Sequence, residues 1–347
     1  MEERLSKVRD EIDGIDQKVL RLLEERLLLA EEVARIKERQ EDVALTDPKR
    51  EEEIFARLRE STEHKVLQAE VENIFSICMS MSKRVRIIRH QQEKNRYLPS
   101  LSIGIVGHGN FGALLSQIFT MHWGQSKLQV HDPEQTVDQE SFFDLADVCR
   151  ADLLFLCVPI SSMTHVLETI KPLLAESTTV IDVCSVKMYA VEQMKVILGE
   201  DRRMIATHPM FGPQSTKQGT DFYGLNMVMH NLSAPSFVYD VVTQFWRNLG
   251  VNVVEMTPED HDRYAAYSIN YNHLMGRVGE AIGLQTTPID TKGFRVIYDA
   301  LQYVTSDTWE LFRDMQQHNP FAQEMRDKVR TAMTHIEGKL LPPQNNS

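Results

Sequence analysis

The sequence predicts a multidomain α/β protein with an all-helical N-terminal domain, a doubly wound and mostly parallel Rossmann-type sheet, and an all-helical C-terminal domain. Two observations predict this class. Residues 1–90 hold 39 of the 88 charged side chains in a chain of 347 residues. From Leu101 onward, short runs rich in Val and Ile alternate with longer amphipathic segments, which is typical of strands joined by crossover helices.

The first 90 residues are expected to be entirely helical. Apolar residues recur at helical spacing from Leu5 to Leu27, and this stretch contains a single glycine. Asp47 before Pro48 is a typical helix start, since Asp caps a helix and proline fits its first turn. We therefore expect helices over 3–39, 48–61 and 65–89, followed by a linker over 91–100.

The next domain, residues 101–257, is expected to hold the sheet, and residues 258–347 to form the helical substrate and dimerisation domain. The apolar runs are too short for helices, and the segments between them are long enough for crossovers. The expected strands are 102–106, 128–131, 153–158, 179–183, 204–206, 226–229 and 251–254.

Composition argues against several classes of protein. The net charge of −12 disfavours nucleic acid as a partner, because that affinity depends on Lys and Arg neutralising phosphates. No run approaches the roughly 18 apolar residues of a membrane span, and the start is charged where a signal peptide would be apolar. The four cysteines show no CxxC spacing, so we expect free thiols, no metal and a cytoplasmic location.

A glycine motif predicts a dinucleotide site. The expected strand 102–106 runs directly into Gly107-His108-Gly109-Asn110-Phe111-Gly112 and then into an amphipathic helix. The glycines permit a tight turn, approach of backbone to a pyrophosphate, and close packing of helix on strand. Asp132 ends the next strand, where a carboxylate can bind both ribose hydroxyls. No arginine follows it closely, so NAD is favoured over NADP.

Polar groups at two later strand ends are candidates for the substrate side. His208 comes directly off a strand and begins the run His-Pro-Met-Phe-Gly-Pro, and Ser185 follows the strand before it. A single strand-end histidine is commonly structural. Its place in the expected cofactor crevice, before a rigid Pro and Gly loop, favours a functional role.

These residues resemble a known family. The glycine motif, the strand-end pair Val158-Pro159 (also placed at the cofactor), Ser185-Val186-Lys187 and the run from His208 to Pro213 are similar to the prephenate dehydrogenases. The first 90 residues resemble the all-helical chorismate mutase domain. Their order is that of the bifunctional chorismate mutase–prephenate dehydrogenases of tyrosine biosynthesis. The resemblance implies an isomerase and an NAD-dependent oxidoreductase in one chain.

In the mutase the resemblance implies a cationic site around a dianion, with Lys37 donating to the ether oxygen of chorismate. Arg26 and Lys37 are 11 residues apart, close to one helix face. Arg9 precedes Arg26 by 17 residues, roughly 25 Å along the helix. It therefore serves another site, which fits the family's intertwined homodimer. The matching positions are Arg9, Arg26, Lys37, Asp47, Arg50, Glu51, Ser82 and Arg86, where Arg86 replaces the usual Gln or Glu.

In the dehydrogenase the resemblance makes His208 the group that binds the C4 hydroxyl of the substrate and takes its proton, with Ser185 beside it. His273 and Arg295 match polar residues of the substrate region. Trp309 and Phe312 are expected to be core or dimer contacts. The usual arginine before Asp307 is replaced by Gln302 or Tyr303, and the usual acidic residue of the histidine loop by Gln214. Arg277 or Arg295 could supply the missing cation.

Three alternatives stay open. The leading one is the conversion of chorismate through prephenate to 4-hydroxyphenylpyruvate. A second acts on 4-amino-4-deoxychorismate and its rearranged product, with arogenate as a further substrate of the same class; the altered positions Gln214 and Gln302 motivate it. In the third, Arg86 marks an inactive mutase-like module that serves only in dimerisation or ligand sensing. The generic alternative, an NAD-dependent dehydrogenase with a helical dimeriser, lacks support from the paired motifs.

Overall fold

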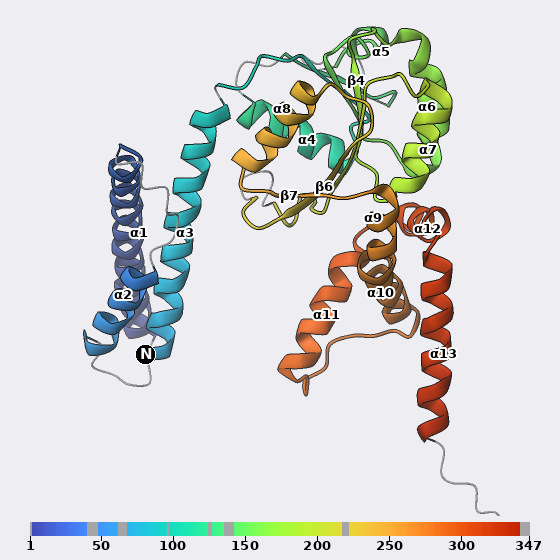
Figure 1. Ribbon diagram of the computed structural model, residues 1–347. Helices are drawn as coiled ribbons and strands as arrows, with labels where there is room; N and C mark the ends of the chain where they lie inside the picture. The colour runs from blue at the N-terminus through green and yellow to red at the C-terminus, as the bar shows by residue number, and fades with distance from the viewer. Residues whose placement is uncertain are drawn as a thin grey trace, which may run out of the picture. The chain divides into compact units, whose positions relative to one another are not determined.

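The structure is a computed structural model that describes residues 2–39, 48–61, 68–95, 97–123, 127–134, 142–216 and 222–340 (Figure 1). It divides into two compact units. One is the chain up to Asn95 together with Asn248–Gly250, and the other holds the remaining residues. No helix in these described ranges is both long enough and apolar enough to span a membrane.

The N-terminal unit consists of three helices, α1 (Glu2–Arg39), α2 (Pro48–Ser61) and α3 (Gln68–Asn95), with α1 and α2 packed on α3. Of the described apolar side chains on these three helices, Cys78 and Met79 are buried. Many others are more than a third exposed, mostly along α1: Leu5, Val8, Ile12, Ile15, Val19, Leu20, Leu22, Leu28, Leu29, Val33, Ile36, Ile74, Ile77 and Met81. One copy of this unit therefore leaves most of its apolar surface uncovered.

The second unit is built on one seven-stranded sheet in the order β2-β1-β3-β4-β5-β6-β7. The strands β1 to β5 are mutually parallel, β6 is antiparallel to β5, and β7 is parallel to β6. The strands are β1 (Ile103–Val106), β2 (Leu128–His131), β3 (Leu153–Leu156), β4 (Thr179–Asp182), β5 (Met204–Pro209), β6 (Asn226–Asn231) and β7 (Asn252–Glu255). Strand order reverses between β1 and β3, the place where a doubly wound sheet opens a crevice for a ligand.

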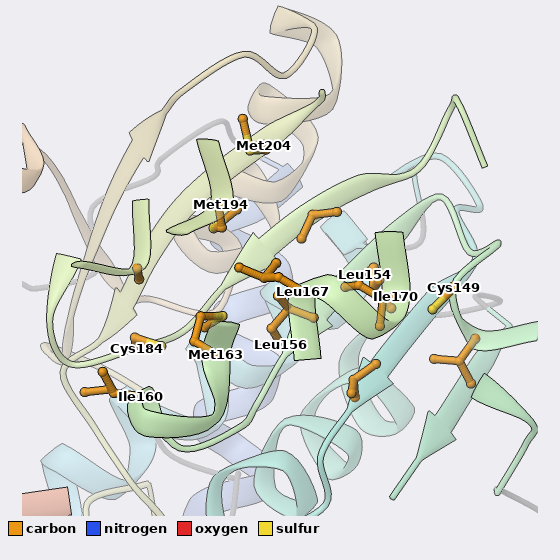
Figure 2. Close-up of a cluster of buried hydrophobic side chains, with 14 of the residues drawn as sticks. Cys149, Leu154, Leu156, Ile160, Met163, Leu167, Ile170, Cys184, Met194 and Met204 are labelled. Carbon is orange, nitrogen blue, oxygen red and sulfur yellow. The ribbon is translucent and has the colours of Figure 1, made fainter. Parts of the chain in front are cut away.

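Helices cover both faces of this sheet (Figure 1). On one face, α6 (Met163–Ile170) and α7 (Lys187–Leu198) bury an aliphatic and sulfur-rich core against β3, including Leu154, Leu156 and Met163 (Figure 2). On the other, α4 (Asn110–His122) and α8 (Ser236–Asn248) contribute to an aromatic cluster with Phe155 of β3. Leu154 and Phe155 point to opposite faces because successive side chains of a strand alternate.

Short elements connect these layers: α5 (Leu145–Val148) and the 3₁₀ turns Ile160–Ser162 and Lys171–Leu173. After β7 the described chain is helical. Thr257, Thr291 and Thr308 each cap a helix by accepting from a backbone N–H of its first turn. The helices are α9 (Pro258–Ala265), the π-helical turn Ala266–Asn270, α10 (Tyr271–Ala281), α11 (Lys292–Thr305), α12 (Trp309–His318) and α13 (Ala322–Leu340).

The predicted fold class is confirmed: a helical N-terminal domain, a parallel-dominated Rossmann-type sheet and a helical C-terminal region. Several details differ from the expectation. The strand β3 ends at Leu156 rather than at residue 158, and β5 continues to Pro209 rather than ending at residue 206. The α3 helix continues to Asn95, so the first half of the expected linker 91–100 is helical. Trp309 was expected in a core or at a dimer contact, and it is 61% exposed, which excludes the core. The starts of α1 and α2 lie within one residue of their predicted positions.

Candidate active sites

The turn after β1 is shaped by two crowded glycines and one open glycine. Gly107 has φ = 94°, and a Cβ there would lie 2.3 Å from the carbonyl oxygen of Cys157, which follows β3. A Cβ at Gly112 would lie 2.1 Å from the carbonyl oxygen of Gly107, so α4 packs directly on the turn. At Gly109 nothing lies within 4 Å of a Cβ. The backbone is thus bare where a ligand would approach the start of α4.

Asp132 stands at the rim of this turn. One carboxylate oxygen accepts the backbone N–H of His108 at 2.6 Å, and the other accepts that of Glu134 at 2.9 Å. No side chain caps the start of α4, where Gly109 occupies the N-cap position. Free helix-start amides favour a pyrophosphate, and a held carboxylate favours a ribose diol, so these residues fit a dinucleotide.

His208, the penultimate residue of β5, takes part in a buried series of hydrogen bonds. Its Nδ1 lies 2.8 Å from Nε2 of His261, and Nδ1 of His261 lies 2.8 Å from a carboxylate oxygen of Asp262. The Asp262 carboxylate also accepts the backbone N–H groups of Lys187 and Met188 at 2.8 Å each, at the first turn of α7. His208, His261 and Asp262 are 6%, 2% and 0% exposed. Nδ1 of His208 is engaged by His261, so Nε2 is the ring nitrogen that lies outside this series of hydrogen bonds.

A buried ion pair lies behind the histidine. The Lys187 ammonium donates to the Asp182 carboxylate and to the backbone carbonyl of Thr207, which precedes His208. This pair ties the end of β4 to the end of β5. Burial, reinforced by His261 and Lys187, holds the pKa of His208 well below its ordinary value of 6.5. This environment therefore favours the neutral form of the His208 imidazole.

Two contacts join the histidine loop to its surroundings. The ring of Phe211, three residues after His208, lies 6.5 Å from that of Phe111 in the first turn of α4. The Gln214 amide donates to the hydroxyl of Ser306, after α11, at 3.4 Å. Ser185 is half-buried between β4 and α7. The loop after His208 thus connects the glycine turn with the helical C-terminal region.

The predicted substrate-side residues of α10 are buried. His273 is 6% exposed, with Nε2 3.6 Å from the Asp307 carboxylate, and burial lowers its pKa below 6.5. Arg277 is 7% exposed; it donates to Glu280 at 2.8 Å and to the backbone carbonyl of Asp307. Its guanidinium also lies 4.5 Å from the ring centroid of Trp309. Its buried Nε has no hydrogen-bond partner among the described residues, and its role toward the substrate stays a prediction.

The other positions predicted around the two ligands are less enclosed. Arg295 is exposed, and its Nε lies 3.8 Å from the Asp290 carboxylate. Val158 is half-buried and Pro159 exposed at the end of β3, and Asn110 is exposed at the start of α4. Val158 lies beneath the glycine turn, with its Cγ1 3.1 Å from a Cβ placed at Gly107.

In the N-terminal unit, Arg26 and Ser82 of the predicted mutase site come together. One guanidinium nitrogen of Arg26 donates to the Ser82 hydroxyl at 2.6 Å and to the Cys78 carbonyl at 2.9 Å. Both side chains are half-buried between α1 and α3. Arg50 is exposed and bonds Glu53 at 3.1 Å, and Arg9 is exposed. Asp47 and the side chains of Lys37, Glu51 and Arg86 lie outside the described residues.

Sequence reasoning assigned no role to four residues that the structure places around His208: Asp182, Lys187, His261 and Asp262. The run from Glu259 to Asp262 was visible, but nothing in its spacing places it against a strand end 53 residues earlier. Two adjacent titratable residues just after a helix cap were the available signal. Within the described part of the chain, no group of three or more His, Cys, Asp and Glu is arranged to hold a metal ion.

These features define a class: a Rossmann-type oxidoreductase with a buried histidine near a strand end, preceded by a small helical domain. Family comparisons agree. Residues 8–87 match the chorismate mutase type II family, and residues 126–254 match the prephenate dehydrogenase nucleotide-binding domain. Residues 278–347 match the TYRAAT1-like C-terminal domain. The glycine motif lies before residue 126, so its assignment depends on its own geometry.

Curated relatives match each part. Arogenate dehydrogenase 2 of Arabidopsis thaliana is 32% identical over 273 residues, covering 72% of this chain and 73% of its own. The chorismate mutase of Methanocaldococcus jannaschii is 37% identical over 99 residues, 28% of this chain and 99% of its own. The T-protein of Haemophilus influenzae is 25% identical over 211 residues, covering 60% of this chain and 53% of its own.

Among solved structures, prephenate dehydrogenase from Aquifex aeolicus in complex with hydroxyphenyl propionate and NAD+ has a TM-score of 0.55 at 20% identity. It aligns with 70% of this chain and 91% of its own, which supports the fold. The chain belongs to the prephenate dehydrogenase family and carries a chorismate mutase type II domain at its N-terminus. It is therefore an enzyme that combines an isomerase with an NAD-dependent oxidoreductase, and the two domains together define a bifunctional enzyme of aromatic biosynthesis.

Proposed function

We propose that the chain rearranges chorismate to prephenate and then oxidises prephenate with NAD to 4-hydroxyphenylpyruvate and CO2. The observation that carries the second step is His208, held neutral at the end of β5 and connected through Phe211 to the glycine turn. A neutral imidazole beside a cofactor crevice suits proton abstraction from a hydroxyl. The family matches for both domains support the pairing of the two reactions.

The rearrangement needs no acid, base or nucleophile. Chorismate rearranges once its enolpyruvyl arm is held over the ring, so catalysis consists of positioning and cationic stabilisation of charge on the ether oxygen. Arg26 supplies one cation for this site, and Ser82 and Cys78 hold its guanidinium in place. Lys37, on the same helix, is the proposed donor to the ether oxygen.

In the oxidation, Nε2 of His208 accepts the proton of the C4 hydroxyl as hydride leaves C4. Bound NAD would supply the hydride acceptor. Loss of the ring carboxylate as CO2 aromatises the ring, and the phenol oxygen regains a proton, so His208 ends neutral. Ser185 is proposed to hold the same hydroxyl in line with His208.

We also propose that NAD is preferred to NADP. Both Asp132 oxygens are engaged by backbone amides, which fixes the carboxylate at the rim of the turn. A 2'-phosphate at that position would meet a like charge, whereas a ribose diol donates to it. Comparing kcat/KM for the two cofactors tests this, and equal values contradict it.

Arogenate is the second candidate substrate for the oxidation. Two curated relatives from Arabidopsis thaliana are arogenate dehydrogenases, at 32% and 29% identity. Arogenate carries an ammonium where prephenate carries a ketone. The Asp307 carboxylate is 45% exposed, and Asp307 directly follows Ser306, which accepts a hydrogen bond from Gln214. We propose this carboxylate as the group that pairs with the ammonium of arogenate.

The deciding experiment measures NADH formation by the full chain with prephenate, arogenate or the 4-amino analogue of prephenate at matched concentrations. We expect the highest kcat/KM with prephenate. Preference for arogenate selects the second candidate, and preference for the 4-amino analogue moves the enzyme to a different pathway. Chorismate consumption without NAD tests the mutase domain in the same preparation, and its absence identifies an inactive module.

We further propose a homodimer through both helical domains. The apolar row of α1 is about half exposed from Leu5 to Ile36, and such a row is covered in stable proteins by a partner surface. In the C-terminal region, Val296 and Ile297 of α11 are 70% and 59% exposed. Multi-angle light scattering of the full chain is expected to give twice the monomer mass, and a monomer contradicts the proposal.

The dimer makes a specific prediction for Arg9. Because Arg9 cannot reach the site of Arg26 in its own helix, it is proposed to complete the partner's mutase site. Arg9→Ala and Arg26→Ala homodimers should each lack mutase activity. Exchanging their subunits should restore about a quarter of wild-type activity, since half the dimers are mixed and each mixed dimer has one intact site. No recovery after verified exchange contradicts this assignment.

A further inference from the structure

Behind the proposed substrate position, His208 is the first of three hydrogen-bonded side chains, followed by His261 and Asp262. His208 contacts His261 through Nδ1, and His261 contacts Asp262 through Nδ1, each at 2.8 Å. All three side chains are nine-tenths or more buried. We propose that His261 and Asp262 are positioning residues that set the tautomer of His208 and share the proton it takes. The inference rests on the proposed role of His208.

The positions of the protons on His208 and His261 follow from the state of Asp262. Its carboxylate accepts two backbone N–H groups at the start of α7, and a helix N-terminus favours a negative charge. An ionised carboxylate only accepts hydrogen bonds, so Nδ1 of His261 is the donor to it. Neutral His261 then has a bare Nε2, which accepts from Nδ1 of His208. His208 is thereby left with a bare Nε2 to receive the substrate proton.

The same hydrogen bonds would allow His208 and His261 to share the proton taken from the substrate. When His208 takes the hydroxyl proton at Nε2, it becomes a buried cation near the Lys187 ammonium, which is unfavourable. Transfer of its Nδ1 proton to Nε2 of His261 moves the positive charge next to the Asp262 carboxylate. The reverse transfer returns the proton through Nε2 of His208 to the product phenol oxygen. No atom or electron is gained or lost in the cycle.

The surroundings hold this geometry rigid. Lys187 and Asp182, next to His208, are paired with each other. The Asn319 amide donates to the Asp262 backbone carbonyl at 2.8 Å and so fixes α9 from the C-terminal side. A relay of this kind needs fixed distances, and each member here is bonded on both sides except at Nε2 of His208.

The kinetic test uses the full chain with His261→Leu and His261→Gln. Glutamine retains an oxygen that can accept from Nδ1 of His208 but cannot take a proton, whereas leucine does neither. We expect kcat of the oxidation to fall about 10³-fold for the leucine variant, within the range of general-base effects, and only about 10-fold for the glutamine variant, which keeps the hydrogen bond to His208. KM for the substrate should stay within about 3-fold, because His261 does not touch substrate. The mutase rate of each preparation is the internal control.

A matched control separates this role from general destabilisation. His122, the last residue of α4, is also a buried histidine, 7% exposed, and its ring packs on that of Phe222. His122→Leu should lower the melting temperature without lowering kcat as His261→Leu does. The relay is overturned if both His261 variants keep kcat within 3-fold of wild type, or if their losses match that of His122→Leu at equal loss of stability.

A second measurement is independent of activity. Nitrogen-15 NMR of histidine-labelled full chain, assigned with His208→Asn and His261→Leu, reports which ring nitrogen carries hydrogen. We expect Nδ1–H and a bare Nε2 in both residues; hydrogen on Nε2 of His208 overturns the tautomer assignment. If His208→Asn retains oxidation of the preferred substrate, the proposed function of His208 fails instead, and the spectra still decide the hydrogen-bonded arrangement.

Discussion

Two substitutions in the glycine turn, at Gly112 and at Gly109, should separate an effect on fold stability from an effect on cofactor binding. A methyl group at Gly112 would stand 2.1 Å from the Gly107 carbonyl oxygen and 3.3 Å from Cβ of Cys157. Real Cβ contacts are not shorter than 3.0 Å, so α4 must move by about 0.9 Å from the turn. At Gly109 the same methyl meets nothing within 4 Å. Its φ of −66° and ψ of −168° suit alanine.

Gly112→Ala is therefore an overpacking change, expected to destabilise the dehydrogenase unit by about 1–3 kcal/mol. At about 2–4 °C per kcal/mol for a unit of this size, the melting temperature should fall by about 2–12 °C. Gly109→Ala should leave that temperature nearly unchanged but weaken NAD binding, because the methyl occupies the space left for the pyrophosphate. Both variants should retain mutase activity, which depends on the N-terminal unit.

Thermal melts followed by circular dichroism and calorimetric titration with NAD measure the two effects. An unchanged melting temperature for Gly112→Ala would refute the packing argument, because it would mean that the helix can retreat from the turn at no cost. Undiminished NAD affinity in Gly109→Ala would refute the placement of the pyrophosphate.

Three further predictions test the two sites separately. His208→Asn should lower prephenate oxidation by about 10³-fold or more while the mutase rate is retained, and parallel loss of both activities contradicts the division of labour. Because burial, with His261 and Lys187, lowers the pKa of His208, the base stays unprotonated as pH falls. A profile of kcat/KM should accordingly be level from pH 8 down through 6.5, and a midpoint at 6.5 contradicts this. Arg26→Ala should reduce mutase turnover by about 10²-fold or more without affecting NADH formation from prephenate, whereas exposed Arg21→Ala, on the same helix, should change neither.

The helical C-terminal region holds both cations that the sequence suggested for substrate binding, Arg277 and Arg295. Its last 70 residues match the TYRAAT1-like C-terminal domain. In this region the cation expected to bind the substrate is buried: Arg277 bonds Glu280 and lies over Trp309. Arg295, the other suggested cation, is exposed, with its Nε 3.8 Å from the Asp290 carboxylate, and both assignments stay predictions.

The sequence by itself determined the order of the domains, the fold class and the residues that act through local geometry. The glycine turn, Asp132 and His208 are recognisable because strand, turn and helix follow each other within a few residues, and short-range backbone constraints leave few alternatives. Helical spacing likewise identified α1, and with it the separation of Arg9 from Arg26.

Only the tertiary structure decided which distant side chains meet. His261 reaches His208 across 53 residues, and Arg26 reaches Ser82 across 56, because packing of whole helices brings them together. Burial follows the same rule: Lys187 is 1% exposed and Arg277 is 7%, although both are charged residues that sequence alone would place at a surface. Hydrogen-bonded pairs and buried charges depend on how separate elements pack, and no periodicity within a single element encodes that.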